Sequence, residues 1–267
     1  MPVPPGTPVE QVHSTVVRAA ARAALPFGPA AKVKEVLSAD TQAVKEPSGI
    51  AFHPGRGTLF VVGDRGGVAE ISRDGEVLRR VKLEGHGFEG ITVGPEGRLF
   101  AIEEKKKPTL YELDAQTLQV VAEYEVDTKL RGERVLGDRR NKSAEGLCYV
   151  PEQQAFYAIN QEPPRLVKLA VPLGEKSGKA KAVESLDLSA VIAHQASDVL
   201  YDAASGHFLV LESGGGWGPG AVHELTREGQ LVGRVTVPGV RAEGLALDDS
   251  GAAFIADDAG GVLRVDP

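Results

Sequence analysis

The sequence has only one cysteine, one tryptophan and one methionine in 267 residues. A lone cysteine cannot form an intrachain disulfide, and Cys148 lies in an apolar segment, which indicates a buried thiol rather than a nucleophile. No apolar run approaches the roughly 18 residues that a membrane-spanning helix needs, so we expect no transmembrane segment. The first residues also lack a basic stretch followed by an apolar one, so we expect no signal peptide within this chain.

Positive charge is also scarce, with 30 lysine and arginine residues against 37 aspartate and glutamate residues and a net charge of -7. Such a chain is a poor partner for nucleic acid or for an anionic membrane surface, because both carry dense negative charge. A small anionic ligand held by local cations or by a metal is compatible with it. The hydrophobic fraction of 42% is ordinary for a soluble globular protein and allows a substantial core.

Glycine, in contrast, is abundant, and several of the 32 glycines belong to a repeated motif. The motif begins with glutamate or serine, usually continues with glycine, and enters a short apolar strand. Its five copies begin at Ser48, Glu89, Glu145, Ser197 and Glu243, which are 41, 56, 52 and 46 residues apart. Each copy is followed by a short turn and a second apolar segment. Spacings of this size are typical of β-propeller blades.

The first repeat shows the four strands of one blade. They fall at residues 49–52, 58–62, 68–71 and 77–83, and Asp74-Gly75 marks a tight hairpin between the last two. The last repeat has room for only three strands before the sequence stops. Because a three-stranded blade leaves an open edge, we predict that a strand at residues 33–37 pairs with the C-terminal strand and closes the ring.

These patterns predict an all-β protein, a five-bladed β-propeller of four-stranded antiparallel blades in which an N-terminal strand completes the last blade. The propeller occupies residues 31–267 as one domain. Residues 1–30 form an N-terminal extension that is rich in proline and then in alanine and arginine, with a short helix at residues 16–25. We expect the protein to be a monomer.

Two sets of connections alternate along such a propeller, and one set carries more chemistry. The turns from each first strand to its second strand are short. The connections from second to third strands and between blades are longer and rich in polar residues, as at residues 103–108, 131–142 and 213–220. Because functional groups tend to lie on loops held by a rigid frame, we expect the site on the face formed by these longer connections.

A propeller brings the first residue of each repeat to one level of its central channel. Three carboxylates and two hydroxyls would then converge, and the carboxylates could not all stay ionised without a counter-charge. An all-oxygen lining suits Ca²⁺, whereas zinc would need histidine or cysteine. The alternative is a solvated channel, or one in which Lys142 neutralises a glutamate. We predict a central Ca²⁺ held by Ser48, Glu89, Glu145, Ser197 and Glu243.

A second tier of polar residues ends the second strand of each repeat: Asp64, Glu103, Glu104, Asn160, Gln161, Glu212, Asp257 and Asp258. These residues fit a general acid and base set or a second metal site, and they equally fit a wet rim where strands leave the core. Asp64 and Glu212 are the candidate catalytic residues. An aromatic side chain in a glycine-rich loop offers a platform for a ligand or a protein partner. The predicted ligand contacts are therefore Asp64, Glu103, Lys142, Asn160, Trp217 and Asp257.

The repeated motif, in which Glu-Gly is followed by alternating hydrophobic residues, resembles the SdiA-regulated domain family of YjiK-like propellers. The resemblance rests on residues 141–147, Asn-Lys-Ser-Ala-Glu-Gly-Leu, and on residues 242–246, Ala-Glu-Gly-Leu-Ala, and it covers residues 32–267. It implies a propeller fold. That family has no established biochemical activity, so the resemblance implies no reaction.

The ring is also similar to that of the five-bladed calcium-dependent apyrases, in which serine, glutamate, glutamate, serine and glutamate hold a central Ca²⁺ in the same order. Residues 63–68, Gly-Asp-Arg-Gly-Gly-Val, resemble an apyrase loop whose aspartate belongs to the active site, and Asp64 matches that aspartate. Two apyrase elements that contact nucleotide are replaced here by residues 103–106 and 212–215. The resemblance therefore supports calcium and does not support nucleotide hydrolysis.

Three functional hypotheses follow from the sequence, and they leave open whether the protein is an enzyme. The leading one is a calcium-binding propeller that acts as a binding or scaffold module for a small anionic ligand or a protein partner. It implies an extracytoplasmic location (periplasm or cell surface), where free calcium is abundant, with a cytoplasmic location as the alternative. The second is a Ca²⁺-dependent hydrolase of a phosphate ester or similar anionic substrate. The third is a protein-interaction propeller that binds a peptide over Trp217.

Overall fold

The structure is a computed structural model, and it describes residues 25–38, 43–105, 107–137, 142–214, 218–239, 241–259 and 261–267. The described part confirms the all-β prediction, with short 3-10 turns at Pro95–Gly97 and Pro151–Gln153. No helix within these ranges is long and apolar enough to span a membrane. The helix predicted at residues 16–25 falls, except for Leu25, outside the described ranges.

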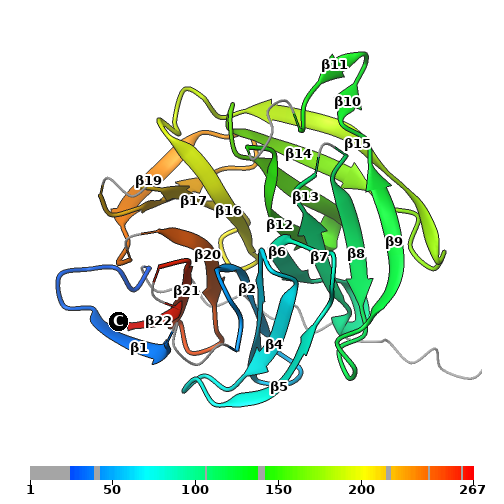
Figure 1. The fold of residues 1–267 in the computed structure, drawn as a ribbon. Helices are drawn as coiled ribbons and strands as arrows, with labels where there is room; N and C mark the ends of the chain where they lie inside the picture. Colours follow the sequence, from blue (N-terminus) through cyan, green and yellow to red (C-terminus); the bar gives the residue numbers. More distant parts are fainter. Residues whose placement is uncertain are drawn as a thin grey trace, which may run out of the picture.

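Three sheets have four antiparallel strands each (Figure 1). The first consists of β2 (Pro47–His53), β3 (Thr58–Gly63), β4 (Gly67–Ile71) and β5 (Val77–Lys82). The second consists of β16 (Gln195–Asp202), β17 (His207–Ser213), β18 (Ala221–Leu225) and β19 (Leu231–Thr236). The third consists of β20 (Ala242–Leu247), β21 (Ala253–Asp257), β22 (Gly261–Asp266) and the N-terminal strand β1 (Lys32–Leu37).

A further sheet has eight strands and consists of two antiparallel halves. One half contains β6 (Phe88–Val93), β7 (Leu99–Glu103), β8 (Thr109–Leu113) and β9 (Val120–Val126). The other half contains β12 (Ala144–Val150), β13 (Ala155–Asn160), β14 (Arg165–Ala170) and β15 (Ser177–Asp187). The outer strands β9 and β15 pair in parallel and join the halves. A hairpin of β10 (Lys129–Leu130) and β11 (Glu133–Arg134) projects from the connection between them (Figure 1).

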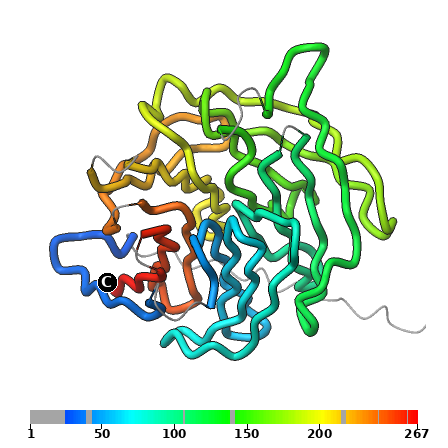
Figure 2. The backbone as a smooth tube through the Cα atoms, in the orientation of Figure 1, coloured from blue at the N-terminus to red at the C-terminus, as the bar shows by residue number. Residues whose placement is uncertain are grey.

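Strand β1 completes the sheet that holds the C-terminal strand. It pairs antiparallel with β22, with Lys32 opposite Asp266 and Val33 opposite Val265, and the blue and red segments lie together in Figure 2. This confirms the pairing predicted from the missing strand of the last repeat. The pairing also covers an edge of β22 that would otherwise present unpaired N–H and C=O groups.

The innermost strand of each four-stranded unit lies toward a common centre (Figures 1 and 2). Contacts run from β2 to β6, from β6 to β12, from β12 to β16, from β16 to β20, and from β20 back to β2. These strands therefore form a closed cycle, and the fold is propeller-like. The beginnings of the five sequence repeats meet at one end of this cycle, as the side-chain interactions of the site show.

The hydrophobic core lies between neighbouring sheets. Successive side chains of a strand point to opposite faces of its sheet, so each sheet packs against a neighbour on either side. Leu209 of β17 packs with Leu245 and Ile255 of the next sheet, and all three are buried. The rings of Phe100 in β7 and Phe156 in β13 have centroids 4.6 Å apart. This packing gives the central channel a rigid frame.

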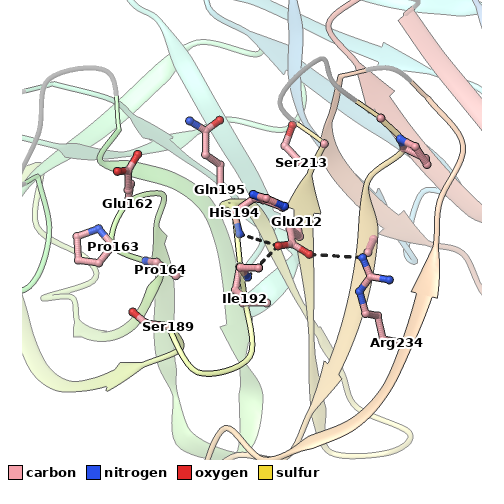
Figure 3. Close-up of a pocket in the computed structure, with 15 residues that line it drawn as sticks. Glu162, Pro163, Pro164, Ser189, Ile192, His194, Gln195, Glu212, Ser213 and Arg234 are labelled. Atoms are coloured by element: carbon pink, nitrogen blue, oxygen red, sulfur yellow. Dashed lines mark hydrogen bonds and ion pairs between the residues drawn. The ribbon is translucent and has the colours of Figure 1, made fainter.

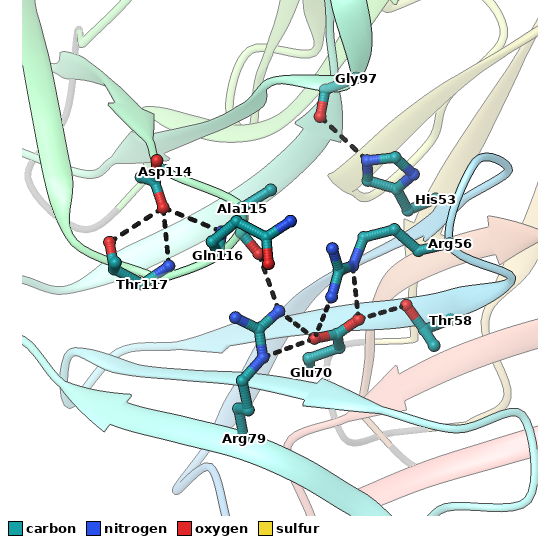
Figure 4. Close-up of polar contacts among 10 residues, drawn as sticks. All are labelled: His53, Arg56, Thr58, Glu70, Arg79, Gly97, Asp114, Ala115, Gln116 and Thr117. Carbon is teal, nitrogen blue, oxygen red and sulfur yellow. Dashed lines mark hydrogen bonds and ion pairs between the residues drawn. The ribbon is translucent and has the colours of Figure 1, made fainter.

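A buried carboxylate fastens the outer part of the first sheet (Figure 4). Glu70 of β4 accepts hydrogen bonds from Arg56 Nε at 2.8 Å, Thr58 Oγ1 at 2.7 Å and Arg79 Nε at 2.8 Å. Burial alone would raise the pKa of Glu70, but these hydrogen bonds outweigh it and lower the pKa to about 2. Arg79 also donates to the carbonyl oxygen of Ala115 at 2.8 Å, which ties this sheet to the next one.

Candidate functional site

The first residue of each repeat lies at an irregularity in the strand ladder. In β2, β6, β16 and β20 the register skips one residue opposite the second strand, and the skipped residues are Ser48, Glu89, Ser197 and Glu243. In β12 a wider irregularity between Ala144 and Leu147 includes Glu145. A β-bulge takes its extra residue out of the ladder and redirects its side chain. The ring predicted from the sequence is thus a ring of bulges.

Glycine follows the bulged residue in four repeats because the innermost strands approach closely there. A Cβ atom on Gly49 would lie 2.9 Å from the Cα of Gly90, and one on Gly90 would lie 2.9 Å from the Cα of Gly146. A Cβ atom on Gly244 would lie 3.0 Å from the Cα of Gly49. A Cβ atom at these positions would crowd the neighbouring innermost strand, so the motif needs glycine for this close packing.

The fourth repeat has Asp198 in place of this glycine, and its carboxyl group accepts backbone N–H groups from two innermost strands. Its side chain is buried, with Oδ1 accepting the N–H of Val199 and Oδ2 accepting the N–H of Leu245, both at 2.8 Å. Strands β16 and β20 are therefore bridged by one carboxyl group. Burial raises the pKa of Asp198 well above its ordinary value. The sequence pattern predicted no role for Asp198, although Asp198 replaces the glycine of the other repeats.

The glutamates of the ring lie close enough for their charges to raise one another's pKa values. Burial and the charges of Asp64 and Glu104 raise the pKa of Glu89 to about 9. Burial and the charges of Glu89 and Glu104 raise the pKa of Glu145 well above its ordinary value. The pKa of Glu104 is raised as well, chiefly by burial. The structure therefore brings Glu89 and Glu145 together with two residues of the predicted second tier.

Glu243 and the two ring serines complete this level of the channel. Burial and the charges of Asp258 and Asp64 raise the pKa of Glu243 to about 8. Ser48 donates a hydrogen bond to Asp64, whose charge also raises the pKa values of Glu89 and Glu243. This serine therefore lies beside the ring glutamates. Ser197 is buried and donates to the carbonyl oxygen of Ala242 at 3.1 Å.

The second tier divides into two groups with different roles. The charges of Asp64, Glu104 and Asp258 help to raise the pKa values of the ring glutamates. The residues before Glu104 and Asp258, and the equivalent residues in two other four-stranded units, are buried and accept hydrogen bonds from backbone N–H groups. We call these four residues the clamps: Glu103, Asn160, Glu212 and Asp257.

Each clamp accepts an N–H group from the segment that leads into the innermost strand of its own sheet. Glu103 accepts from Gly87 at 3.1 Å, and Asn160 accepts from Gly137 at 3.1 Å. Glu212 accepts from Ala193 at 2.9 Å and from His194 at 2.7 Å. Asp257 accepts from Arg241 at 3.3 Å. These contacts suit an anchoring role that aims the bulged strands at the axis.

Other predicted ligand residues lie at the rim or outside the described ranges. Lys142 is about one third exposed and pairs with Glu162. Trp217 lies outside the described residues, so its predicted role stays a prediction.

Arg241 Nη1 is 2.7 Å from Asp258, and its charge moderates the raised pKa of Glu243.

A cavity of about 780 Å³ opens beside the ring, at the ends of β16 and β17 (Figure 3). Pro163, Pro164 and Ile192 contribute apolar walls, and Arg234 contributes a positive charge. At its centre lies Glu212, which accepts a hydrogen bond from His223 Nε2 at 2.8 Å and lies 3.8 Å from Arg234 Nη2. Burial acts to raise the pKa of Glu212, but the hydrogen bonds from His223 and from the N–H of His194 lower it overall.

The donor set of the ring is entirely oxygen. Within the described ranges, no three histidine, cysteine, aspartate or glutamate side chains are arranged to hold a metal ion as they stand. Ser48 instead donates to Asp64, and the glutamates have raised pKa values. Crowded buried carboxyl groups need either protons or a bound cation as counter-charge. The chemistry of the ring therefore fits a hard cation such as Ca²⁺.

The closed cycle of innermost strands and the acidic ring at one end define a propeller-like protein with a polar channel mouth. The sequence family can be stated more narrowly. The chain belongs to the SdiA-regulated family, whose profile matches residues 32–259. Among proteins with curated descriptions, none matches this chain.

Solved structures with similar folds support the propeller-like architecture. Glutaminyl cyclase from Myxococcus xanthus has 17% identity and a TM-score of 0.58, with 83% of this chain and 90% of that chain covered. A protein of unknown function from Bacteroides thetaiotaomicron has 16% identity and a TM-score of 0.57, with 89% and 76% covered. A luciferin-regenerating enzyme has 13% identity and a TM-score of 0.53, with 89% and 95% covered. At these identities the similarity shows the fold alone.

Proposed function

We propose that this protein is a five-bladed calcium-binding propeller that serves as a binding or scaffold module, with a small ligand at the acidic mouth of its channel. Strand pairing supports five blades, because three sheets have four strands each and the eight-stranded sheet has two halves of four. The closed cycle of β2, β6, β12, β16 and β20 supports the same number. An extracytoplasmic location, where free calcium is abundant, belongs to this proposal.

The observation that carries the proposal is the crowding of buried carboxyl groups at the ring. Glu89, Glu145 and Glu243 all have pKa values raised by burial and by neighbouring carboxylates. A cation bound among them would replace protons as the counter-charge and would let these groups ionise. Carboxylate and hydroxyl oxygens without histidine or cysteine favour Ca²⁺ over zinc.

The individual ring residues fit this cation in their chemistry. Glu89, Glu145 and Glu243 would supply carboxylate oxygens. Ser48 and Ser197 donate their hydroxyl hydrogens to Asp64 and to the Ala242 carbonyl, which leaves oxygen lone pairs for the cation. Ca²⁺ tolerates irregular coordination completed by water, and glutamate side chains at bulged positions can turn toward it. Bound Ca²⁺ would tie together strands of five blades.

The cavity beside the ring is the proposed ligand pocket. Its volume of about 780 Å³ is in the range of small-molecule sites, which run from roughly 300 to 1,000 Å³. Arg234 places a positive charge on its wall, and a bound Ca²⁺ at the neighbouring ring would add another. Because the carboxylates of Glu162 and Glu212 also line this cavity and Glu212 lies 3.8 Å from Arg234, an anionic ligand would depend on the charge of the bound Ca²⁺. Its apolar part would rest on Pro163, Pro164 and Ile192.

Calcium-dependent stabilisation tests this proposal. A ligand present at one hundred times its dissociation constant stabilises the folded state by about 2.7 kcal/mol, so Ca²⁺ should raise the melting temperature and a chelator should lower it. Glu145→Gln should reduce this response, because it removes a buried carboxylate from the ring. Glu228→Gln, at an exposed turn, is the matched control and should respond like the wild type. Equal melting temperatures in Ca²⁺ and in chelator would contradict the proposal.

One observation favours a second function, a Ca²⁺-dependent hydrolase of a phosphate ester or similar anionic substrate. Glu89, with a pKa of about 9, lies beside Asp64, which accepts the hydrogen bond of Ser48. Neighbouring carboxyl groups of which one retains its proton are suited to general acid and base catalysis. Ca²⁺ would act as the Lewis acid, and Asp64 would orient water.

A panel of phosphate esters and lactones, assayed with Ca²⁺, separates the two functions. Turnover that is lost in Asp64→Asn and kept in Glu228→Gln supports the hydrolase. No turnover across the panel, together with a calcium-dependent melting temperature, supports the binding module. Glu212, the other candidate catalytic residue, has both carboxyl oxygens occupied by protein donors, so we assign it to positioning in either case.

A further inference from the structure

The channel has a second cavity at its opposite end. This cavity has a volume of about 690 Å³ and is lined by residues of all five innermost strands, so it lies on the axis of the cycle. We call it the axial funnel. Asp198 lies at its inner end, between the funnel and the acidic ring. The residues that line the funnel further out are mostly large and apolar or aromatic: Phe52, Val93, Tyr149, Tyr201 and Leu247.

The funnel differs from the acidic mouth in charge. Among its described lining residues the carboxyl groups are those of Glu96, which is exposed, and of Asp198, whose oxygens accept backbone N–H groups. Lysine and arginine are absent from the same described lining. An ion entering this space would lose its hydration without gaining an opposite charge. The funnel therefore suits a neutral molecule.

One buried polar atom of a residue that lines the funnel lacks a partner. His53 is 8% exposed, and its Nε2 atom lies 2.9 Å from the carbonyl oxygen of Gly97. A carbonyl oxygen only accepts, so Nε2 carries the hydrogen and Nδ1 of the neutral ring is an acceptor. Nδ1 is buried and has no hydrogen-bond partner. A Cβ atom on Gly55 would lie 3.7 Å from Nδ1, so the missing side chain of Gly55 leaves space beside it.

We propose that the axial funnel binds a small, neutral, mainly apolar molecule that carries one N–H or O–H donor. Its volume of about 690 Å³ is that of a typical small-molecule site, where apolar walls supply most of the affinity and a few polar groups fix the orientation. The donor enters beside Gly55 and hydrogen-bonds to His53 Nδ1. The site is separate from the acidic ring, because Asp198 and the close-packed glycines lie between them.

Fluorescence of N-phenyl-1-naphthylamine, a neutral aromatic probe with a single N–H, tests the proposal. The wild type should bind it saturably. Val93→Trp and Leu247→Trp each fill the funnel and should weaken binding at least about tenfold, since the probe and the indole compete for one space. Val232→Trp places the same side chain on β19, where Val232 is 52% exposed, and should leave binding unchanged. Circular dichroism confirms that each variant is folded.

The role of the donor is tested with Gly55→Ala and with the N-methyl form of the probe, which has no N–H. The new methyl group meets His53 at an ordinary contact distance of 3.4 Å, so the fold should be kept. Gly55→Ala should weaken binding of the N–H probe by about three- to tenfold, which is the loss of affinity expected for one hydrogen bond. Binding of the N-methyl probe should be unaffected. An equal effect on both probes would overturn the donor assignment.

The same titration in Ca²⁺ and in chelator separates this site from the proposed calcium ring. Because the two sites lie on opposite sides of Asp198, probe affinity should be the same in both buffers, and Glu145→Gln should not change it. The funnel proposal therefore stands or falls independently of calcium binding. The absence of saturable binding to the wild type would overturn it, and so would binding that survives both Val93→Trp and Leu247→Trp in folded protein.

Discussion

Neighbouring acidic residues at the ends of the second strands have different tasks. Glu103 accepts the N–H of Gly87 and the hydroxyl of Tyr111, whereas Glu104 acts on Glu89 and Glu145 in the ring. Glu103 is the last residue of β7 and lies opposite Phe88, beside the bulge of β6, whereas Glu104 follows the end of the strand. One residue turns back to hold its own sheet, and the next reaches the channel.

Asp198 gives the first prediction at the residue scale. Asp198→Gly restores the glycine of the other repeats, but it leaves the buried N–H groups of Val199 and Leu245 without their acceptor. Leaving buried donors unpaired costs about 1–3 kcal/mol each, so the free energy of unfolding should fall by at least about 2 kcal/mol. Urea denaturation measures this. Unchanged stability would show that Asp198 does not bridge the innermost strands.

Glu70 gives a prediction about acid stability. Its pKa is lowered to about 2 from an ordinary value of 4.5, so its stabilising effect is fully present above pH 4.5 and is lost as the pH falls toward 2. Glu70→Gln should be less stable than the wild type at pH 6, and the difference should shrink between pH 4.5 and pH 2. Melting temperatures across this range test it. A difference that stays constant with pH would contradict the assignment.

The sequence alone could predict the ring residues and could not predict the clamps. The repeated Ser/Glu position is visible because it recurs at blade spacing, and this recurrence located Glu89, Glu145 and Glu243. In pairs such as Glu103-Glu104 and Asp257-Asp258 both residues are acidic, so composition does not show which one faces the channel. That distinction depends on the bulge opposite each pair, which becomes visible only when the strands are paired.

At the scale of elements, the pairing of β1 with β22 followed from counting strands, whereas the parallel pairing of β9 with β15 did not. The C-terminal repeat was visibly one strand short, so the sequence supplied a reason to look for a fourth. The contact between β9 and β15 depends on how far an 11-residue outer strand extends beyond its own sheet. No local pattern encodes that reach.

The closing strand gives a prediction at this scale. A chain that starts at residue 39 lacks β1 and exposes the edge of β22, so it should melt at a lower temperature and should self-associate through the open edge. A chain that starts at residue 25 keeps β1 and is the matched control. Thermal melts and size-exclusion chromatography compare the two. Equal melting temperatures and equal elution volumes would show that β1 contributes little to closure.

At the scale of the whole molecule, protons and calcium should compete for the ring. The pKa values of Glu89 and Glu243 are raised to about 9 and about 8 from an ordinary 4.5. Without metal, these groups favour the folded state at low pH, and that contribution is lost as the pH rises from about 4.5 through 8 to 9. Because Ca²⁺ replaces these protons, a fixed Ca²⁺ concentration should raise the melting temperature more at pH 8.5 than at pH 6. A larger rise at pH 6 would contradict this linkage.

The most direct measurement of the central claim is an electron-density map of crystals grown in calcium. We predict one calcium ion on the axis, contacted by carboxylate oxygens of Glu89, Glu145 and Glu243, and absent from crystals of Glu145→Gln. An axis that holds only water in calcium-rich crystals of the wild type, or a calcium ion bound away from these three glutamates, would contradict it.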